Sequence, residues 1–161
     1  MHAIKSKVGL RGSNVGFKLT APEDLWRVEV DEGQMNQVFN NLIINADKAM
    51  PNGGTIEARI ENVTLTGAEG LPLPEGKYVK ISIADSGIGI PKENLAKVFD
   101  PYFSTKQVGH GLGLATAYSI VTRHDGLITV QSVPGAGATF EIYLPAVGNK
   151  KTARSGRIIE T

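Results

Sequence analysis

The feature that most constrains the fold is one amphipathic helix followed at once by a strong helix breaker. Apolar residues recur at steps of three and four from Met35 to Ala49. Asp31 precedes this run, and Gln34 lies three residues after Asp31. This is the spacing of a capping box, and it predicts the first turn of the helix. The run ends at 50–54, Met-Pro-Asn-Gly-Gly. A helix with one apolar face must bury that face against a second layer.

Strand patterns supply the second layer. Alternating apolar residues predict strands at 15–19, 26–30, 55–66, 78–84, 127–133 and 138–144, with turns rich in Gly and Pro at 67–76 and 134–137. A short helix is expected at 92–98, and a longer one at 112–123 that Gly126 ends in the left-handed conformation. Hairpins and helices in one chain favour an α/β (α+β) two-layer sandwich, with a mixed, mostly antiparallel sheet and helices on one face.

The composition narrows the class of protein. The chain has 161 residues, enough for one domain with one core, and no cysteine, which excludes disulfides and thiolate zinc sites. No apolar run approaches the roughly 18 residues of a membrane helix, and a net charge of +1 does not indicate a nucleic-acid partner. Glycine is unusual, with 19 residues where average usage predicts about 11. The surplus indicates close backbone approach or backbone freedom somewhere in the domain.

The two ends of the chain lack apolar periodicity. Residues 1–13 are predicted to be a loose lead-in, and residues 146–161 a flexible basic tail or linker. The globular domain is therefore expected to span 14–145.

Four stretches carry candidate chemistry, and the first lies on the long helix. Asn41, Asn45 and Lys48 are spaced i, i+4 and i+7, so they form one stripe. An amide oxygen is a hard ligand that suits Mg²⁺. Taken alone, the stripe is more simply explained as a solvated helix face.

The second stretch, 85–91, follows a predicted strand with the sequence Asp-Ser-Gly-Ile-Gly-Ile-Pro. The carboxylate of Asp85 can accept a hydrogen bond from an exocyclic amine, although a plain Asp-Gly turn is the simpler alternative. The third stretch, 99–106, holds aromatic residues that fit a covering of the core, and Lys106, which can reach a phosphate.

The fourth stretch, 109–115, opens a helix with Gly-His-Gly-Leu-Gly-Leu-Ala. Glycines before a helix N-terminus let backbone N–H groups converge on an anion. The stretch does not follow a strand, which excludes the dinucleotide-binding fingerprint, and it lacks the Gly-Lys-Ser/Thr ending of a P-loop.

In this order, Asn45, Asp85, the stretch 99–106 and the stretch 109–113 resemble the N, G1, F and G2 boxes of sensor histidine kinases. The boxes are those of the catalytic ATP-binding domain (HATPase_c), which has the GHKL fold and acts in bacterial two-component signal transduction. The resemblance covers roughly residues 14–145. It implies a cytoplasmic domain, whether or not the parent protein is membrane-anchored.

The run 45–54, Asn-Ala-Asp-Lys-Ala-Met-Pro-Asn-Gly-Gly, is most similar to the nitrogen-sensor subgroup. The resemblance implies that Asn45 ligates Mg²⁺, that Asp85 binds the adenine amine of ATP, and that Thr139 joins a water network around the base. It implies that Asn41, Lys48 and Lys106 approach the phosphates under a short lid. The full set of implied site residues is Asn41, Asn45, Lys48, Asp85, Gly87, Gly89, Ile90, Lys106, Gly109, His110, Gly111, Leu112, Gly113, Leu114 and Thr139.

One departure separates the chain from other GHKL enzymes. Gyrase-type ATPases, heat-shock chaperones and anti-sigma-factor kinases resemble one another in a Glu general base four residues before the Mg²⁺ Asn. That position is Asn41 here, and an amide cannot take the proton. The departure fits transfer to a histidine, whose imidazole is already nucleophilic.

The acceptor histidine is expected outside this chain, because neither His2, His110 nor His124 lies in a suitable helical context. The implied partners are the dimerisation and histidine-acceptor domain of a parent kinase and, indirectly, a response regulator. We expect no nucleic-acid or membrane contact and an isolated domain that is a monomer. A nucleotide-binding regulatory module, or an ATPase without phosphotransfer, is the alternative.

Overall fold

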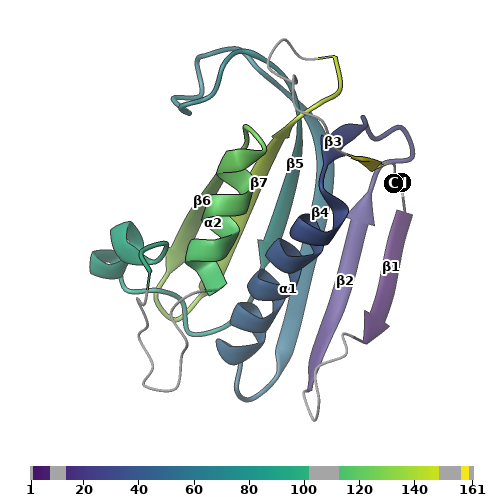
Figure 1. Cartoon of the computed structure of the whole chain (residues 1–161). Coiled ribbons are helices and arrows are strands. Elements are labelled where there is room, and N and C mark those ends of the chain that lie inside the picture. Colours follow the sequence, from purple (N-terminus) through teal and green to yellow (C-terminus); the bar gives the residue numbers. More distant parts are fainter. Residues whose placement is uncertain (1, 8–13, 102–112, 149–156, 160–161) are drawn as a thin grey trace.

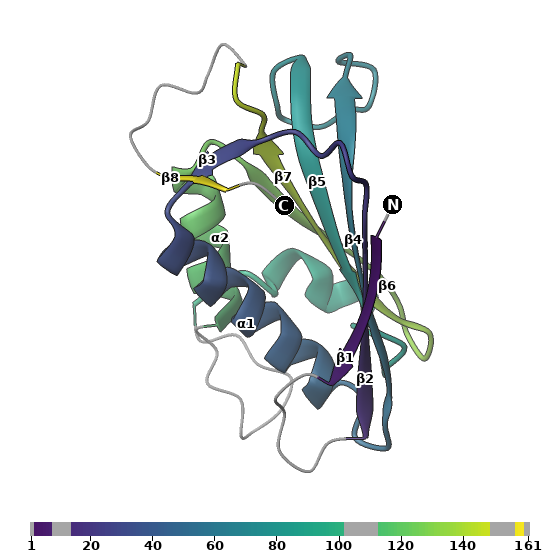
Figure 2. The same ribbon diagram turned by 90° about the vertical axis from the view of Figure 1, so that its right-hand side faces the viewer.

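The sheet and its two long helices form two layers, with both helices on one face of the sheet (Figures 1 and 2). The computed structural model describes residues 2–7, 14–101, 113–148 and 157–159. The strands are β1 His2–Lys7, β2 Val15–Ala21, β3 Val28–Val30, β4 Gly54–Leu65, β5 Gly76–Ala84, β6 Leu127–Val133, β7 Gly137–Pro145 and β8 Arg157–Ile159. The helices are α1 Glu32–Lys48, the 3-10 helix η1 Lys92–Lys97, and α2 Gly113–Arg123.

The main sheet has the strand order β1-β2-β4-β5-β7-β6, and β3 and β8 form a separate two-stranded sheet. Only β2 and β4 pair in parallel; every other pair of described strands is antiparallel. A parallel pair needs a crossover connection, and α1 lies in the crossover from β2 to β4. The predicted mixed, mostly antiparallel sheet with helices on one face is confirmed.

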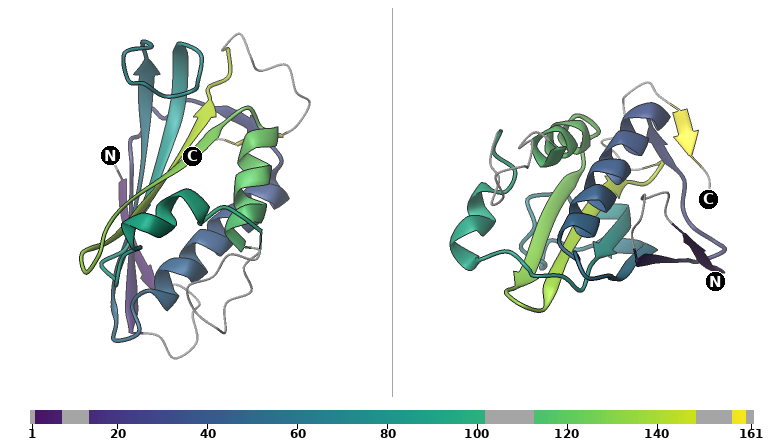
Figure 3. Two further views of the ribbon diagram at one scale, coloured as in Figure 1. Left: turned by 90° about the vertical axis from the view of Figure 1, so that its left-hand side faces the viewer. Right: turned by 90° about the horizontal axis from the view of Figure 1, so that it is seen from below.

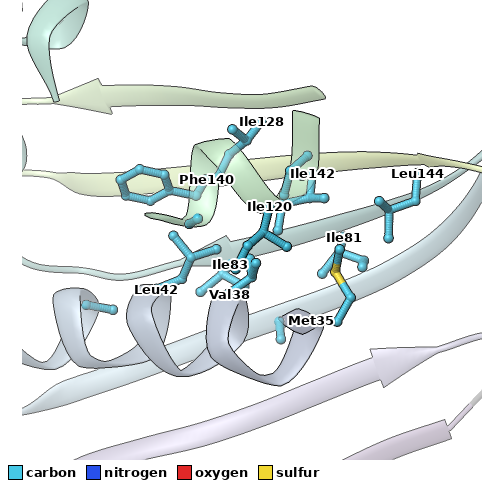
Figure 4. Close-up of a cluster of buried hydrophobic side chains, with 14 of the residues drawn as sticks. Met35, Val38, Leu42, Ile81, Ile83, Ile120, Ile128, Phe140, Ile142 and Leu144 are labelled. Atoms are coloured by element: carbon cyan, nitrogen blue, oxygen red, sulfur yellow. The ribbon is translucent and has the colours of Figure 1, made fainter. Parts of the chain in front are cut away.

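The core lies between the helices and one face of the sheet (Figure 4). The α1 residues Met35, Val38 and Leu42 are at most 1% exposed. They pack with Ile120 of α2 and with side chains of the central strands. These strand residues occupy alternate positions: Ile81 and Ile83 on β5, and Ala138, Phe140, Ile142 and Leu144 on β7. The residues between them project from the opposite face, which no described helix covers (Figure 3).

The cap of α1 is the one expected from the sequence. The Asp31 Oδ1 atom accepts a hydrogen bond from the Gln34 N–H at 2.9 Å, and helix α1 runs to its C-cap at Ala49. Asp31 also donates its backbone N–H to Nε2 of His124, at the end of α2. The N-terminus of α1 is therefore attached to the C-terminus of α2, and His124 ends its own helix as expected.

The end of α2 corrects one prediction. Asp125 has φ +61°, whereas Gly126 does not have positive φ, so the left-handed residue is Asp125. The Gly126 N–H donates to Val121 O and the Asp125 N–H donates to Thr122 O, both at 3.0 Å, which is the Schellman pattern. A Cβ on Gly126 would collide with the carbonyl oxygen of Tyr143. Gly126 is needed for close approach to β7 rather than for its backbone conformation.

The ends of the chain also differ from expectation. His2–Lys7 is a strand paired with β2, and Arg157–Ile159 is a strand paired with β3. The predictions of a loose lead-in and a flexible tail are wrong for these two segments, because edge strands are held by backbone hydrogen bonds and need no apolar alternation. The fold also continues beyond 145, since Ala146 is 2% exposed and forms a bridge with Val28, and the Val147 N–H donates to Arg27 O. The origin of the end segments as linkers stays a prediction.

Two glycine substitutions test the role of close approach at the end of α2. Gly126→Ala should lower the free energy of unfolding by about 1–3 kcal/mol, the range for overpacking. Gly33→Ala, on the exposed first turn of α1, should raise it by about 0.5–1 kcal/mol, because alanine loses less backbone entropy. Urea unfolding followed by the fluorescence of the single tryptophan measures both. Equal changes in the free energy of unfolding for the two variants would contradict a collision between the added Cβ at position 126 and the Tyr143 carbonyl oxygen.

Candidate nucleotide-binding site

One end of the sandwich brings together four segments that are distant in sequence. They are the C-terminal turn of α1, the loop 85–90 after β5, the turn between β6 and β7, and the first residue of α2, at the lower end in Figure 1. The Ile88 N–H donates to Ala49 O at 3.1 Å, and the Asp85 N–H donates to Ala138 O at 2.9 Å. Asn41 Nδ2 donates to Gly113 O at 2.9 Å. Backbone and amide hydrogen bonds thus hold the loop and both helices in fixed relation.

Asp85 is half-buried at the centre of this end. Its Oδ1 atom accepts hydrogen bonds from the Gly87 N–H at 2.8 Å and the Ala138 N–H at 3.3 Å. Burial raises the pKa of the Asp85 carboxyl, and these two hydrogen bonds offset the increase only in part. Oδ2 accepts no hydrogen bond from any residue that the structure describes. One oxygen fixes the carboxylate, and the other is available to a ligand.

The glycines of the loop are required by packing within the chain. A Cβ on Gly87 would collide with the carbonyl oxygen of Ala49. Gly89 has φ +77°, and a Cβ there would lie 2.5 Å from Val133 O. The loop is therefore pressed between the end of α1 and the end of β6. This packing accounts for both glycines, so they do not by themselves indicate a bound base.

Ser132 is a residue of this end that the sequence analysis missed. Its Oγ accepts a hydrogen bond from the Ile90 N–H at 2.7 Å and donates one to Gly137 O at 3.0 Å. Ile90 is half-buried against the core, so Ser132 fixes the backbone of one of the site residues that the family resemblance implies. The signal was present in the sequence, because Ser132 alternates with the apolar residues Ile128 and Val130 and is polar at a core-facing position.

The stripe on α1 faces the same end, and its members differ in their contacts. Asn41 uses its amide N–H on Gly113 O, whereas the half-buried Asn45 side chain makes no hydrogen bond with another described residue. Lys48 is exposed in the last turn. Among the described residues no group of three His, Cys, Asp or Glu side chains is arranged to hold a metal. Mg²⁺ keeps several waters and shares substrate phosphate oxygens, so a single oxygen ligand from the protein, such as the Asn45 amide oxygen, fits it.

The structure does not bring Thr139 to this site. Ala138 and Phe140 point into the core, so Thr139 between them projects from the opposite face of the sheet. Thr139 pairs with Ala84 and Gln131 there. Within β7, Ala138 donates its backbone N–H to the Asp85 carboxylate.

Part of the expected site lies outside the described residues: Lys106, Gly109, His110, Gly111 and Leu112. Gly113 begins α2, and Leu114 packs against the core. Phe99, from the third stretch, lies 6.1 Å from the Phe140 ring and 5.5 Å from the Tyr118 ring between centroids. Phe99 therefore covers the core, as the simpler interpretation of that stretch predicted.

The sequence and the fold both match known proteins. Residues 30–148 match the profile of the histidine kinase-, DNA gyrase B-, and HSP90-like ATPase family. The chain belongs to this family. It is 42% identical over 149 residues to the sensor kinase CckA of Brucella abortus (strain 2308), which covers 89% of this chain and 16% of that protein. It is 39% identical over 137 residues to the sensor histidine kinase ZraS of Klebsiella oxytoca, covering 85% of this chain and 27% of that protein.

Solved structures of sensor kinases share the fold. The catalytic domain of the histidine kinase ThkA in a nucleotide-free form matches with a TM-score of 0.67 and 28% identity, over 91% of this chain and 97% of that one. Full-length ShkA in complex with AMPPNP matches with a TM-score of 0.62 and 25% identity, over 84% of this chain and 26% of that one. In sequence and fold, this chain corresponds to the catalytic ATP-binding domains of sensor histidine kinases. It spans 16% and 27% of the lengths of CckA and ZraS, and its nitrogen-sensor likeness stays a prediction.

No helix in the described part of the chain is both long and apolar enough to cross a membrane.

The raised pKa of Asp85 predicts a pH-dependent stability difference from Asp85→Asn. The folded-state pKa lies above the ordinary value of 3.8, so the favourable contribution is complete below that value and is lost as pH rises through the folded-state pKa. From pH 4 to pH 7, wild type should therefore lose free energy of unfolding relative to the Asn variant. Urea unfolding of both proteins at each pH measures the difference. A difference that stays constant or changes in the opposite direction would contradict the dominance of burial.

Proposed function

We propose that this domain binds Mg-ATP and donates the γ-phosphoryl group to a histidine on a dimerisation hairpin elsewhere in its parent kinase. The observation that carries the proposal is the convergence of a half-buried carboxylate with one uncommitted oxygen, Asp85, and the uncommitted amide of Asn45. Both face one end of a fold that belongs to an ATP-binding family. A response regulator would then receive the phosphoryl group from that histidine.

Asp85 supplies the base selectivity in this proposal. Its free Oδ2 accepts a hydrogen bond from the 6-amino group of adenine, whereas guanine presents a carbonyl oxygen at that position. Two acceptors facing each other leave both unsatisfied, which costs about 1–3 kcal/mol for each buried polar group. The carboxylate therefore favours ATP over GTP.

The polar stripe on α1 supplies the residues that bind Mg²⁺ and the phosphates of ATP in this proposal. Asn45 would hold Mg²⁺, which when bound neutralises charge on the phosphate oxygens. Lys48, one turn nearer the helix end, would approach the phosphates as a point charge. Lys106 and the stretch 109–113 are assigned to the phosphates as part of the same proposal.

Asn41 argues for phosphotransfer rather than hydrolysis. Its amide cannot accept a proton in place of a general base, and its Nδ2 atom is committed to Gly113 O. An imidazole acceptor needs no such base, because its own nitrogen lone pair attacks phosphorus while the bond to ADP breaks. This difference favours a histidine kinase domain over an ATPase.

The affinity for nucleotide tests the base site. Asp85→Asn should weaken Mg-ADP binding by tenfold or more, since an amide can turn a donor toward the amine of adenine. Thr139→Val should leave the affinity within about twofold, because its side chain lies on the other face of the sheet. Isothermal titration calorimetry measures both variants. Unchanged affinity in Asp85→Asn, or an equal loss in Thr139→Val, would refute the assignment.

A transfer assay decides between the proposed function and its alternatives. The domain joined to an acceptor hairpin from a sensor kinase should, with γ-labelled ATP, yield an acid-labile, alkali-stable phosphohistidine, while the isolated domain hydrolyses ATP only slowly. Nucleotide binding without transfer would make the domain a regulatory module. Rapid steady hydrolysis by the isolated chain would make it an ATPase, and absence of Mg-ADP binding would refute all three.

A further inference from the structure

Met50 contacts the loop 85–90, which carries the proposed adenine ligand Asp85, directly through its sulfur atom. It lies one residue beyond the C-cap of α1 and is only 4% exposed. Its Sδ atom accepts two hydrogen bonds from Ser86, one from the backbone N–H and one from the Oγ hydroxyl, both at 3.4 Å. Ser86 immediately follows Asp85, the proposed adenine ligand, so the sulfur is one residue removed from the base site.

The local backbone is shaped around this sulfur. The Met50 N–H donates to Asp47 O, and the Gly53 N–H donates to Met50 O, both at 3.0 Å. A Cβ on Gly54 would lie 2.6 Å from Sδ of Met50 and 2.9 Å from Oγ of Ser86. The absence of a side chain at Gly54 therefore leaves the space in which sulfur and hydroxyl meet. The segment 50–54, which ends helix α1, therefore also forms the contact between Met50 and Ser86.

We infer that Met50 is a positioning residue for base recognition. Asp85 is fixed on its sheet side by the N–H of Ala138. On the helix side, Met50 fixes the next residue, Ser86, and the adjacent Ala49 O accepts the Ile88 N–H. The loop that selects the base is thereby attached to the helix that carries Asn45, so the base and phosphate halves of the site keep one relative geometry. The inference rests on the proposed function.

A packing role alone would make a different prediction. Met50 belongs to the buried apolar cluster, and leucine fills nearly the same volume without an acceptor atom. Met35, within α1, is 1% exposed in the same cluster. It makes no hydrogen bond through sulfur with any described residue. Met35→Leu is therefore the matched control, with the same atoms changed in the same core.

The decisive measurement compares ADP with inosine diphosphate, which has a carbonyl group in place of the 6-amino group. In wild type, Mg-ADP should bind more tightly in calorimetry. Met50→Leu removes both hydrogen bonds to sulfur, which is a weak acceptor, and should weaken Mg-ADP binding by about two- to tenfold, with little change for inosine diphosphate. Met35→Leu should keep the wild-type ratio of the two affinities. Thermal unfolding of both variants shows whether they lose comparable stability.

Two further measurements test whether the change in ADP preference acts through Ser86. Ser86→Ala should lower the ADP preference in wild type and add nothing in Met50→Leu, because coupled residues are not additive. In nitrogen-15 correlation spectra without nucleotide, the Ser86 amide proton should move upfield in Met50→Leu and stay in place in Met35→Leu.

The outcomes separate this inference from the function on which it rests. If wild type prefers ADP and Met50→Leu keeps that preference, or if Met35→Leu loses it equally, the positioning role is wrong while the function stands. If wild type binds neither diphosphate, the proposed function fails and the inference falls with it.

Discussion

The contact on which the site depends is the close approach of the C-terminal turn of α1 to the loop after β5. The Ile88 N–H donates to Ala49 O at 3.1 Å, and Gly87 passes so near this carbonyl that no side chain fits. The loop cannot move away without leaving a helix carbonyl and its own N–H unpaired. Because α1 also carries Asn41 and Asn45, this backbone contact sets the position of Asp85 relative to the amide stripe. The proposed base and metal sites are thus parts of one rigid unit.

The two faces of the sheet differ in what covers them and in which side chains they carry. The face under α1 and α2 carries the alternate apolar residues that make the core, such as Ile83 and Phe140. The other face carries polar pairs, among them Lys80 and Glu141 with Nζ and Oε2 3.1 Å apart. It also carries a smaller buried apolar cluster, formed by Leu65, Tyr78 and Tyr143. Every nucleotide contact proposed for the described residues comes from the helix side or from the end of the sheet. This separation removes Thr139 from the site, since alternation places its side chain on the face away from the helices.

The sequence predicted the elements well and their long-range contacts poorly. The capping box at Asp31 and the apolar period of α1 are local signals, and the structure confirms both. Alternation in 138–144 was equally local and already placed Thr139 away from Phe140, but the family resemblance assigned it to the base. Strands β1 and β8 gave no signal, because their pairing uses backbone groups that every residue has.

Local patterns along the chain indicate which residues could do chemistry: one stripe of amides on a helix, a carboxylate after a strand, and glycines before a second helix. The contacts that hold these residues in place arise only when distant segments pack together. Met50 lies 36 residues from Ser86, and Ser132 lies 42 residues from Ile90. No short-range period encodes these contacts. Periodicity fixes the face on which a side chain lies, whereas the packing of distant segments selects its neighbours.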